Sequence, residues 1–210
     1  MKKKIVLVVL FVLPVVVYLF FASGVNNFGR LPVLSENITD VSTFDPSVQL
    51  KNKITILGFL GNHVDAKQGN AFNLNQKIYK RFGDFNDFQI VMVVPKGNEP
   101  QISELKNELG KLSNVDKWHF AFGSDAEIRN FFNSLKTNID LDEDLFTPNV
   151  FIIDKDLKLR GRTDDEDEGI KYGFDTSSVA ELNNKMVDDV KIILAEYRLA
   201  LKKNNADRSK

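Results

Sequence analysis

The sequence predicts an α/β fold in which a central mixed β-sheet is flanked by helices. Two observations carry this prediction: short apolar runs that suit buried strands alternate with segments of helical periodicity, and a strand–turn–strand pattern near residue 155 precedes a long closing helix. The chain has 210 residues, enough for one domain and an appendage. Its 43% hydrophobic and 27% charged residues are typical of a folded domain and exclude intrinsic disorder.

Three apolar segments are predicted to be strands, at residues 54–60, 89–94 and 118–122. The second consists of Gln89 followed by five apolar residues, so it has no polar face. A strand of this kind suits the interior of a sheet that is covered on both sides.

Three helices are predicted between and after these strands. The first ends at Gly83. The second has Asn98 as a candidate N-cap and Pro100 in its first turn. The third begins with Ser124 and Glu127, the spacing of a capping box. The apolar positions that define the helical faces are Phe72, Ile78, Tyr79, Phe82, Ile102, Leu105, Leu109, Leu112, Ile128, Phe131, Phe132 and Leu135.

The C-terminal third is predicted to form an antiparallel hairpin and a long amphipathic helix. Strands at 150–154 and 157–162 flank a turn, and Lys158, Arg160 and Arg162 share one face at a period of two. These basic residues either balance nearby acidic charge or keep an edge strand from pairing with neighbours. Ser178 and Glu181 form a second capping-box pattern ahead of the last helix.

The N-terminal segment has the properties of a membrane anchor. It begins with Met1 and three lysines and then runs from residue 5 to residue 22 without a charge. As a helix, these residues span about 27 Å, close to the hydrocarbon thickness of a bilayer. The alternative is a cleaved signal peptide, because Ala22-Ser23-Gly24 offers small residues to a peptidase, although the apolar core of a signal is usually shorter.

In either case the lysines stay in the cytoplasm. We therefore expect a single-pass protein of the cell membrane that contacts lipid through residues 5–22, with its C-terminal domain extracytoplasmic, or periplasmic in a Gram-negative cell. The predicted divisions are an anchor or signal segment at 1–24, an extended tether at 25–51, a folded domain at 52–203 and a polar tail at 204–210. Polar residues and two prolines suggest the tether.

Composition excludes several classes of function. The chain has 0 cysteines, which excludes disulfides, thiolate nucleophiles, iron–sulfur clusters and cysteine–zinc sites. The formal net charge is -1, and without Lys2, Lys3 and Lys4 it is -4, so no nucleic-acid partner is expected. No Gly-x-Ser-x-Gly elbow, Gly-x-Gly-x-x-Gly motif or P-loop occurs. We expect no bound cofactor.

Thr147-Pro148, directly before the apolar stretch 149–154, resembles the Thr-Pro that thioredoxin-fold proteins place, as a cis proline, beside their redox loop. The stretch 146–161, Gly58-Phe59 after the first strand, and the single N-terminal anchor are most similar to the Sco/SenC family. This resemblance covers roughly 53–201 and implies a thioredoxin-like domain. Members of that family deliver copper, or prepare the redox state of the copper site, during assembly of cytochrome oxidase.

The departures from the family are chemically decisive. The resemblance places the two family cysteines of Cys-x-x-x-Cys near Asn62 and Ala66, and the distal histidine near Phe146. A carboxamide and a methyl group supply no soft donor for Cu(I) and exchange no disulfide. In related folds the groove beside the proline holds an extended peptide. The candidate partner groove is lined by Asn62, His63, Ala66, Thr147 and Pro148.

Two histidines and two acidic clusters offer other candidate sites. His63, with Asp65 two residues on, could form a metal site or a general base, or could be a solvated loop residue. His119 lies between aromatic residues on a strand and is expected on a sheet surface. The acidic run 164–168 lacks the spacing of a calcium loop, so a solvated loop or a docking site for a basic partner is favoured. The second cluster comprises Asp140, Asp142, Glu143 and Asp144.

Three functions follow as hypotheses. The first is an extracytoplasmic, membrane-tethered thioredoxin-fold protein without redox or copper ligands, which binds or assembles an envelope protein partner. The resemblance suggests assembly of a respiratory complex, such as cytochrome oxidase, as its process. The second is a cysteine-independent metal-binding protein or enzyme centred on His63 and Asp65. The third is a structural envelope protein that associates with itself through the last helix.

Overall fold

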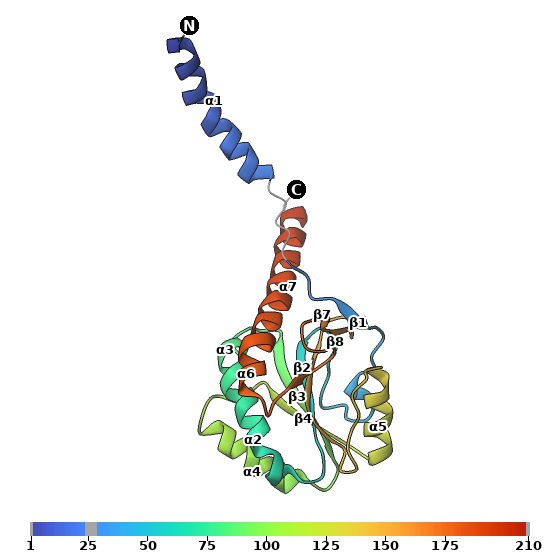
Figure 1. Cartoon of the computed structure of the whole chain (residues 1–210). Coiled ribbons are helices and arrows are strands. Elements are labelled where there is room, and N and C mark those ends of the chain that lie inside the picture. Colours follow the sequence, from blue (N-terminus) through green and yellow to red (C-terminus); the bar gives the residue numbers. More distant parts are fainter. Residues whose placement is uncertain (1, 24–28, 209–210) are drawn as a thin grey trace.

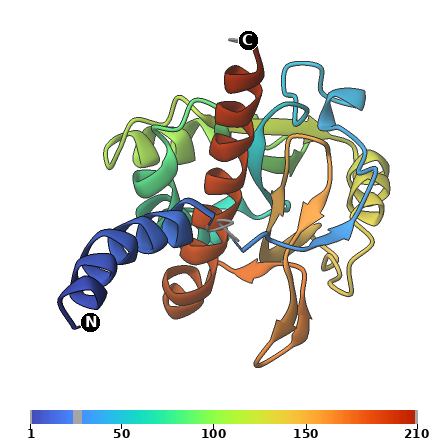
Figure 2. The ribbon, with the colours of Figure 1, turned by 90° about the horizontal axis from the view of Figure 1, so that it is seen from above.

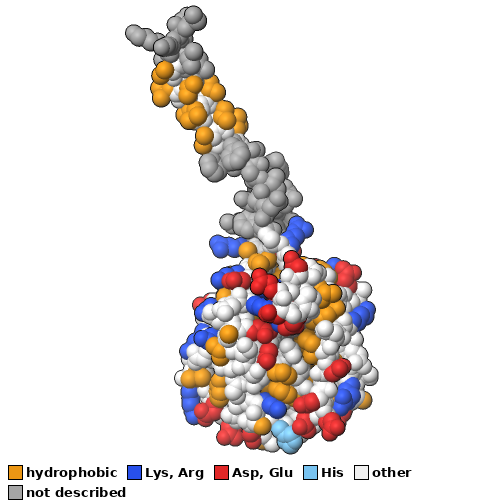
Figure 3. All heavy atoms as spheres, viewed as in Figure 1, with side chains coloured by type: hydrophobic (Ala, Val, Ile, Leu, Met, Phe, Trp, Pro, Cys, Tyr) orange, Lys and Arg blue, Asp and Glu red, His pale blue; other side chains and the backbone are white. Residues whose placement is uncertain are grey.

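The computed structural model describes residues 2–23 and 29–208, which form an α/β body and a separate N-terminal helix, α1 (Lys2–Ser23) (Figure 1). Of α1, the described side chains are those of Val6 and of residues 9–19, and they are exposed (Figure 3). On the residues described, no helix is both long and apolar enough to cross a membrane. Residues 1 and 24–28, which belong to the predicted anchor and tether, lie outside the described residues.

The central sheet is mixed, as the sequence predicts. Its strands follow the order β1 (Val33–Ser35), β6 (Leu159–Arg160), β5 (Phe146–Ile153), β2 (Ile54–Leu60), β3 (Phe88–Pro95) and β4 (Trp118–Gly123), and β9 (Phe174–Asp175) also pairs with β5. Strands β2, β3 and β4 are parallel, whereas β5, β6 and β1 join by antiparallel pairing. Every residue of β2 and β3 is buried, which confirms that these strands lie inside the sheet.

Helices cover both faces of the sheet (Figures 1 and 2). One face packs against α2 (Val64–Leu74), the π-helical turn η2 (Asn75–Tyr79), α3 (Lys80–Phe82), α4 (Glu99–Gly110), α6 (Val179–Glu181), the π-helical turn η3 (Leu182–Met186) and α7 (Val187–Arg208). The other face packs against α5 (Asp125–Ser134) and the segment before β2. Two hydrophobic cores, one on each face, therefore hold the sheet.

Local signals place the helix ends with differing success. Ser124 and Glu127 form a complete reciprocal capping box at the start of α5. Asn98 precedes α4 as predicted, but its side chain donates to the Pro95 carbonyl oxygen instead of capping the helix. Helix α4 ends at Gly110, so Leu112, predicted on its apolar face, is exposed.

The second predicted capping box forms only in part. The Ser178 hydroxyl accepts the Glu181 N–H, but the Glu181 carboxylate accepts from the Asp175 N–H and pairs with Lys171. Glu181 therefore links α6 to β9 and to β8 (Gly169–Lys171), and its side chain does not contact the N-cap residue Ser178.

The segment from Leu31 to Leu50 differs from the predicted extended tether. Strand β1 pairs with β6, a short 3₁₀ turn runs over Val41–Thr43, and the Asp40 carboxylate accepts the N–H groups of Leu50 and Lys51. Several of its apolar side chains enter the core: Leu31, Ile38, Val41, Val48 and Leu50. Burial of these side chains makes the segment part of the folded body.

Candidate functional site

The junction between β2 and α2 is where a fold of this kind would carry chemistry. Gly61 has a φ of +66°, and a Cβ added there would lie 2.5 Å from the Asp144 carbonyl oxygen and 2.8 Å from Phe146 Cβ. The Asn62 N–H donates to that same carbonyl oxygen at 2.9 Å. The loop is therefore pinned against the segment that leads into β5, and glycine is needed for both the backbone angle and the close approach.

His63 directly precedes α2, and its side chain is 68% exposed. Its Nε2 lies 3.5 Å from Asp144 Oδ1, so the two form an ion pair when the imidazole is protonated. The carboxylate of Asp65 accepts a 3.4 Å hydrogen bond from Gln68 on the same helix. Among the described residues, no group of three or more His, Cys, Asp or Glu side chains is arranged to hold a metal ion.

Phe146 occupies the place where the resemblance puts a distal histidine. Its ring is buried beneath Lys67, whose Nζ lies 4.1 Å from the ring centroid. Its N–H donates to the Asp142 carboxylate at 2.8 Å, which fixes the turn before β5. This corner of the site is an aromatic ring covered by a cation, a stabilising arrangement with no ligand atom for copper.

Thr147 and Pro148 lie within β5, and the cis proline implied by the resemblance is absent: no cis peptide bond occurs in the described chain. The ladder between β2 and β5 shifts register here, because Leu57 pairs with Phe151 whereas Phe59 pairs with Thr147. Proline fits this irregularity in an extended strand because it has no N–H to donate to the ladder. Thr147 is buried and Pro148 is partly buried.

The backbone beside Pro148 is already hydrogen-bonded to the chain itself. The Pro148 carbonyl oxygen accepts from the Thr176 N–H at 2.9 Å and from the Thr176 hydroxyl at 2.6 Å. Asn70 and Asn73 of α2 donate to the hydroxyl and the carbonyl oxygen of Thr176. In the predicted groove, Asn62, His63 and Ala66 are therefore exposed, whereas the Pro148 carbonyl oxygen is hydrogen-bonded to Thr176.

The predicted basic face of the hairpin divides into three separate contacts. Lys158 pairs with Glu36 at the surface, while Arg160 is buried and donates to Asp154 and to Glu196 of α7. β6 is not an edge strand, because β1 pairs with it. The basic residues thus fasten α7 and the N-terminal segment to the sheet, in place of the edge protection suggested by the sequence.

Arg162 belongs to a second ion-pair cluster, which includes Asp165 of the acidic run. It contacts Asp189 of α7 at 2.8 Å, and Lys185 contacts Asp165 at 2.7 Å. Burial alone would raise the pKa of Asp165, but hydrogen bonds from Lys185 and the Asp167 N–H outweigh burial and hold the pKa below its ordinary value. Residues 164–168 lie at the end of the hairpin of β7 (Arg162–Asp165) and β8 (Gly169–Lys171), which projects from the body in Figure 2. Four of these five acidic residues are exposed, as expected of a solvated segment, whereas Asp165 is buried.

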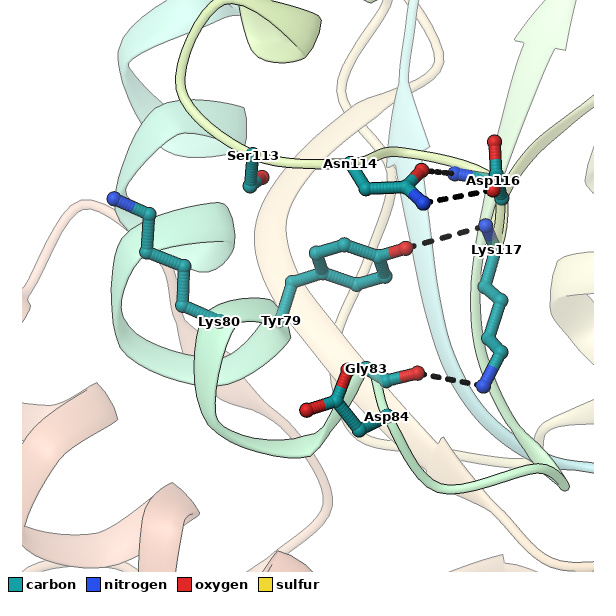
Figure 4. Close-up of a pocket in the computed structure, with 8 residues that line it drawn as sticks. All are labelled: Tyr79, Lys80, Gly83, Asp84, Ser113, Asn114, Asp116 and Lys117. Carbon is teal, nitrogen blue, oxygen red and sulfur yellow. Dashed lines mark hydrogen bonds between the residues drawn. The ribbon is translucent and has the colours of Figure 1, made fainter.

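A polar hollow of about 320 Å³ lies between the end of α3 and the start of β4 (Figure 4). The Tyr79 hydroxyl accepts the Lys117 N–H at 3.2 Å, and Lys117 Nζ donates to the carbonyl oxygens of Gly83 and Phe85. Burial raises the pKa of Tyr79 above its ordinary value, so the phenol stays neutral. The sequence does not indicate this hollow, because its residues come from two segments that lie far apart in the chain, 79–84 and 113–117.

Comparison with known proteins establishes the fold. No protein-family model matches the chain, and no curated protein matches it. A solved structure of BsSco, described as a member of the Sco family of cytochrome c oxidase assembly proteins with a disulfide switch, superimposes with a TM-score of 0.51 and 14% identity, covering 78% of this chain and 97% of that one. The fold is thioredoxin-like.

A second similar structure is that of a putative protein disulfide isomerase from Bacteroides thetaiotaomicron. It superimposes with a TM-score of 0.50 and 13% identity, covering 80% of this chain and 95% of that one. Identities this low show the fold alone. The fold is therefore similar to that of this Sco-family protein, and the prediction of a thioredoxin-like fold is confirmed.

Proposed function

We propose that this chain is an extracytoplasmic, membrane-tethered module of thioredoxin-like fold that binds or assembles an envelope protein and has no redox or copper ligands of its own. The observation that carries the proposal is the loop from Gly61 to Ala66, which holds no thiol at the place where this fold carries redox chemistry, in a chain with 0 cysteines. Assembly of a respiratory complex is the process that the similarity to a Sco-family assembly protein suggests.

The chemistry of the loop supports binding over catalysis. Asn62 and Ala66 replace thiolates, and Phe146 replaces an imidazole, so Cu(I) would find no soft ligand here. Disulfide exchange requires attack by a thiolate, which the chain cannot supply. The exposed Asn62, His63 and Ala66 still form a surface that another protein could contact.

The tether is supported by the charge-free segment 5–22 and by the place where the chain joins the body. Arg160 Nε donates to the Leu31 carbonyl oxygen at 2.8 Å, and its guanidinium also contacts Glu196 of α7. The N-terminal segment thus joins the body beside α7, whereas α2 begins at the opposite end of the body (Figure 1). If residues 5–22 lie in a bilayer, this arrangement holds the loop at the start of α2 away from the lipid.

The test uses the full chain in its native membrane. We expect it to resist extraction at high pH, and a photo-crosslinker at Asn62 or Ala66 to join it to a subunit of a respiratory complex or another envelope protein; a crosslinker at exposed Lys111, on the α4–β4 connection, is the control. Reduction of insulin, or tight binding of one equivalent of Cu(I), by the purified chain would refute the proposal. Stoichiometric metal that is lost in His63→Ala would favour the metal-binding alternative.

A further inference from the structure

Strand β4 forms one edge of the central sheet, and its outward backbone groups define a second surface. Its inward groups follow from the ladder with β3: Ile90 N–H donates to the Lys117 carbonyl oxygen and Lys96 N–H to that of Gly123. Since alternate residues of a strand face opposite sides in hydrogen bonding, the groups of Trp118, Phe120 and Phe122 point away from the sheet.

Two of the three outward N–H groups already have acceptors. Trp118 N–H donates to the Val115 carbonyl oxygen at 3.0 Å, and Phe122 N–H donates to the Asp45 carboxylate at 2.9 Å. In the described part of the chain, no hydrogen bond reaches the N–H of Phe120 or the carbonyl oxygens of Trp118, Phe120 and Phe122. The edge therefore offers one donor and three acceptors.

These groups line a hollow of about 400 Å³. Helix α4 contributes Ile102 and Lys106 on one side, and Ser47 and Val48 lie on the other. Buried and half-buried backbone polar groups are costly to leave unpaired. A hollow that combines such groups with both apolar and polar side chains favours an extended polypeptide over a small apolar ligand.

The charge around the hollow favours an acidic strand. Burial lowers the pKa of His119, and the positive charges of Lys106 and Lys53 lower it further, so the potential there is positive. The carboxylate of Glu99, which also lines the hollow, is engaged by the Gly97 N–H. Lys106 has no ion-pair partner among the described residues.

Other ways of using or filling an edge are less favourable. The carbonyl oxygen of Pro148, where this fold would pair with a peptide, is saturated by Thr176. In a second copy paired antiparallel about Phe120, the Phe122 N–H would face the Trp118 carbonyl oxygen but could not donate to it, because it already donates to Asp45. Such a pairing would also bring the two positively charged Lys106 side chains into one interface. A foreign strand has its own free N–H groups for all three carbonyl oxygens.

We infer that the outer edge of β4 binds an extended segment of a partner protein that carries apolar and acidic side chains, by strand addition at Phe120 with Lys106 contacting an acidic residue. The inference rests on the proposed function in that a protein partner exists, and to the contact proposed at Asn62 and Ala66 it adds a second contact, by backbone pairing, at the sheet edge. Asp45 limits the site, because its carboxylate occupies the Phe122 N–H.

The experiment uses the ¹⁵N-labelled full chain in nanodiscs and three acetylated nine-residue peptides. One alternates Val and Glu, one alternates Val and Lys, and the third is the Val/Glu peptide with N-methylated amides, which cannot donate. We expect the Val/Glu peptide to shift the Phe120 amide resonance and to bind at least tenfold more tightly than the other two. Lys106→Glu should reverse the preference between the Glu and Lys peptides.

Asp45 provides a gain-of-binding test with a matched control. Asp45→Ala frees the Phe122 N–H and removes a negative charge, so it should tighten the Val/Glu peptide about threefold to tenfold. Asp45→Asn removes the same charge but keeps an acceptor, so it should tighten this peptide less. The inference is overturned if no peptide binds at millimolar concentration, if N-methylation has no effect, or if both Asp45 variants behave alike. A partner that crosslinks at Asn62 and not at Phe120 would overturn it while leaving the proposed function intact.

Discussion

Replacing Arg160 with methionine should destabilise the body more than most single substitutions. The Arg160 guanidinium donates to the Leu31 carbonyl oxygen at 2.8 Å, to Asp154 Oδ2 at 2.9 Å and to Glu196 Oε2 at 2.6 Å. The side chain is 5% exposed and that of Asp154 is 2% exposed. Methionine keeps much of the volume and removes every one of these donors.

The magnitude follows from what is left unpaired. Asp154 Oδ1 keeps the N–H groups of Asp156 and Lys158, but Oδ2 becomes a buried acceptor without a cation. Breaking a buried ion pair by removing one partner costs about 3–5 kcal/mol. In a protein of this size, about 3–5 kcal/mol lowers the melting temperature by about 6–20 °C. The 29–50 segment should also become more sensitive to proteolysis, because Leu31 loses its anchor.

Urea denaturation of the full chain in detergent, followed by the fluorescence of Trp118, measures the cost. Trp118 is the single tryptophan and is 1% exposed, so its emission reports unfolding of the core. Arg129→Met, at an exposed arginine of α5, is the matched control and should change stability by less than about 0.5 kcal/mol. Adding Asp154→Asn to Arg160→Met should cost less than the sum of the two single changes. A loss below about 1 kcal/mol in Arg160→Met, or strict additivity, would refute the reasoning.

Three further predictions concern single positions. Gly61→Ala should lose at least about 1–2 kcal/mol in urea denaturation, because φ is positive and the Asp144 carbonyl oxygen lies in the way, whereas Gly69→Ala in α2, with open space around it, should be neutral or stabilising; equal effects would contradict this. Burial, together with the charges of Lys106 and Lys53, lowers the pKa of His119, so the unfolded state binds the proton more readily than the folded state. The free energy of unfolding should therefore fall as the pH drops below about 6.5. In a pH series of melting temperatures His119→Gln should flatten this decline, and an unchanged slope would contradict the prediction. Ser124→Ala should cost about 1 kcal/mol through loss of the capping box, measured by thermal unfolding, and a change within error would show that the cap contributes nothing.

Elements with a strong local signal could be predicted from the sequence. The apolar runs in β2 and β3 are long enough to require burial on both faces, and Ser124 with Glu127 specifies a helix start through contacts within four residues. The order of strands and helices predicts an α/β sandwich. The thioredoxin-like fold is expected from the resemblance carried by Thr147-Pro148 and the hairpin after it, with which this order agrees. These features depend on neighbours in the sequence, so no tertiary contact is needed to recognise them.

The packed segment before β2 could not be predicted in the same way. Leu31, Ile38, Val41, Val48 and Leu50 are buried, but their spacings fit neither a strand nor a helix. Asp40 folds the segment back on itself by accepting the Leu50 N–H, a contact across ten residues. Irregular segments of this kind become ordered through tertiary contacts, and polar residues between the apolar ones hide the signal.

The roles of the basic residues on β6 and β7 depend on elements far away in the chain. Period-two spacing correctly indicates that Arg160 follows a strand pattern, but its partner Glu196 is 36 residues away on α7. The acidic run 164–168 likewise has its cations on η3 and β8, at Lys185 and Lys171. Composition can show that such charges balance, and only the fold shows which pairs form.

The absence of cysteine and the internal hydrogen bonds beside Pro148 are related features. A thioredoxin-like site that exchanges disulfides needs a backbone edge beside its proline that a substrate can pair with. Here Thr176 takes the Pro148 carbonyl oxygen, and Asn62 is bonded to the segment before β5, so both borders of that groove are internal contacts. A peptide placed beside Pro148 would therefore find the Pro148 carbonyl oxygen already hydrogen-bonded to Thr176. Among the described residues, the partner strand that we propose would instead find unpaired carbonyl oxygens on the outer edge of β4, at Trp118, Phe120 and Phe122.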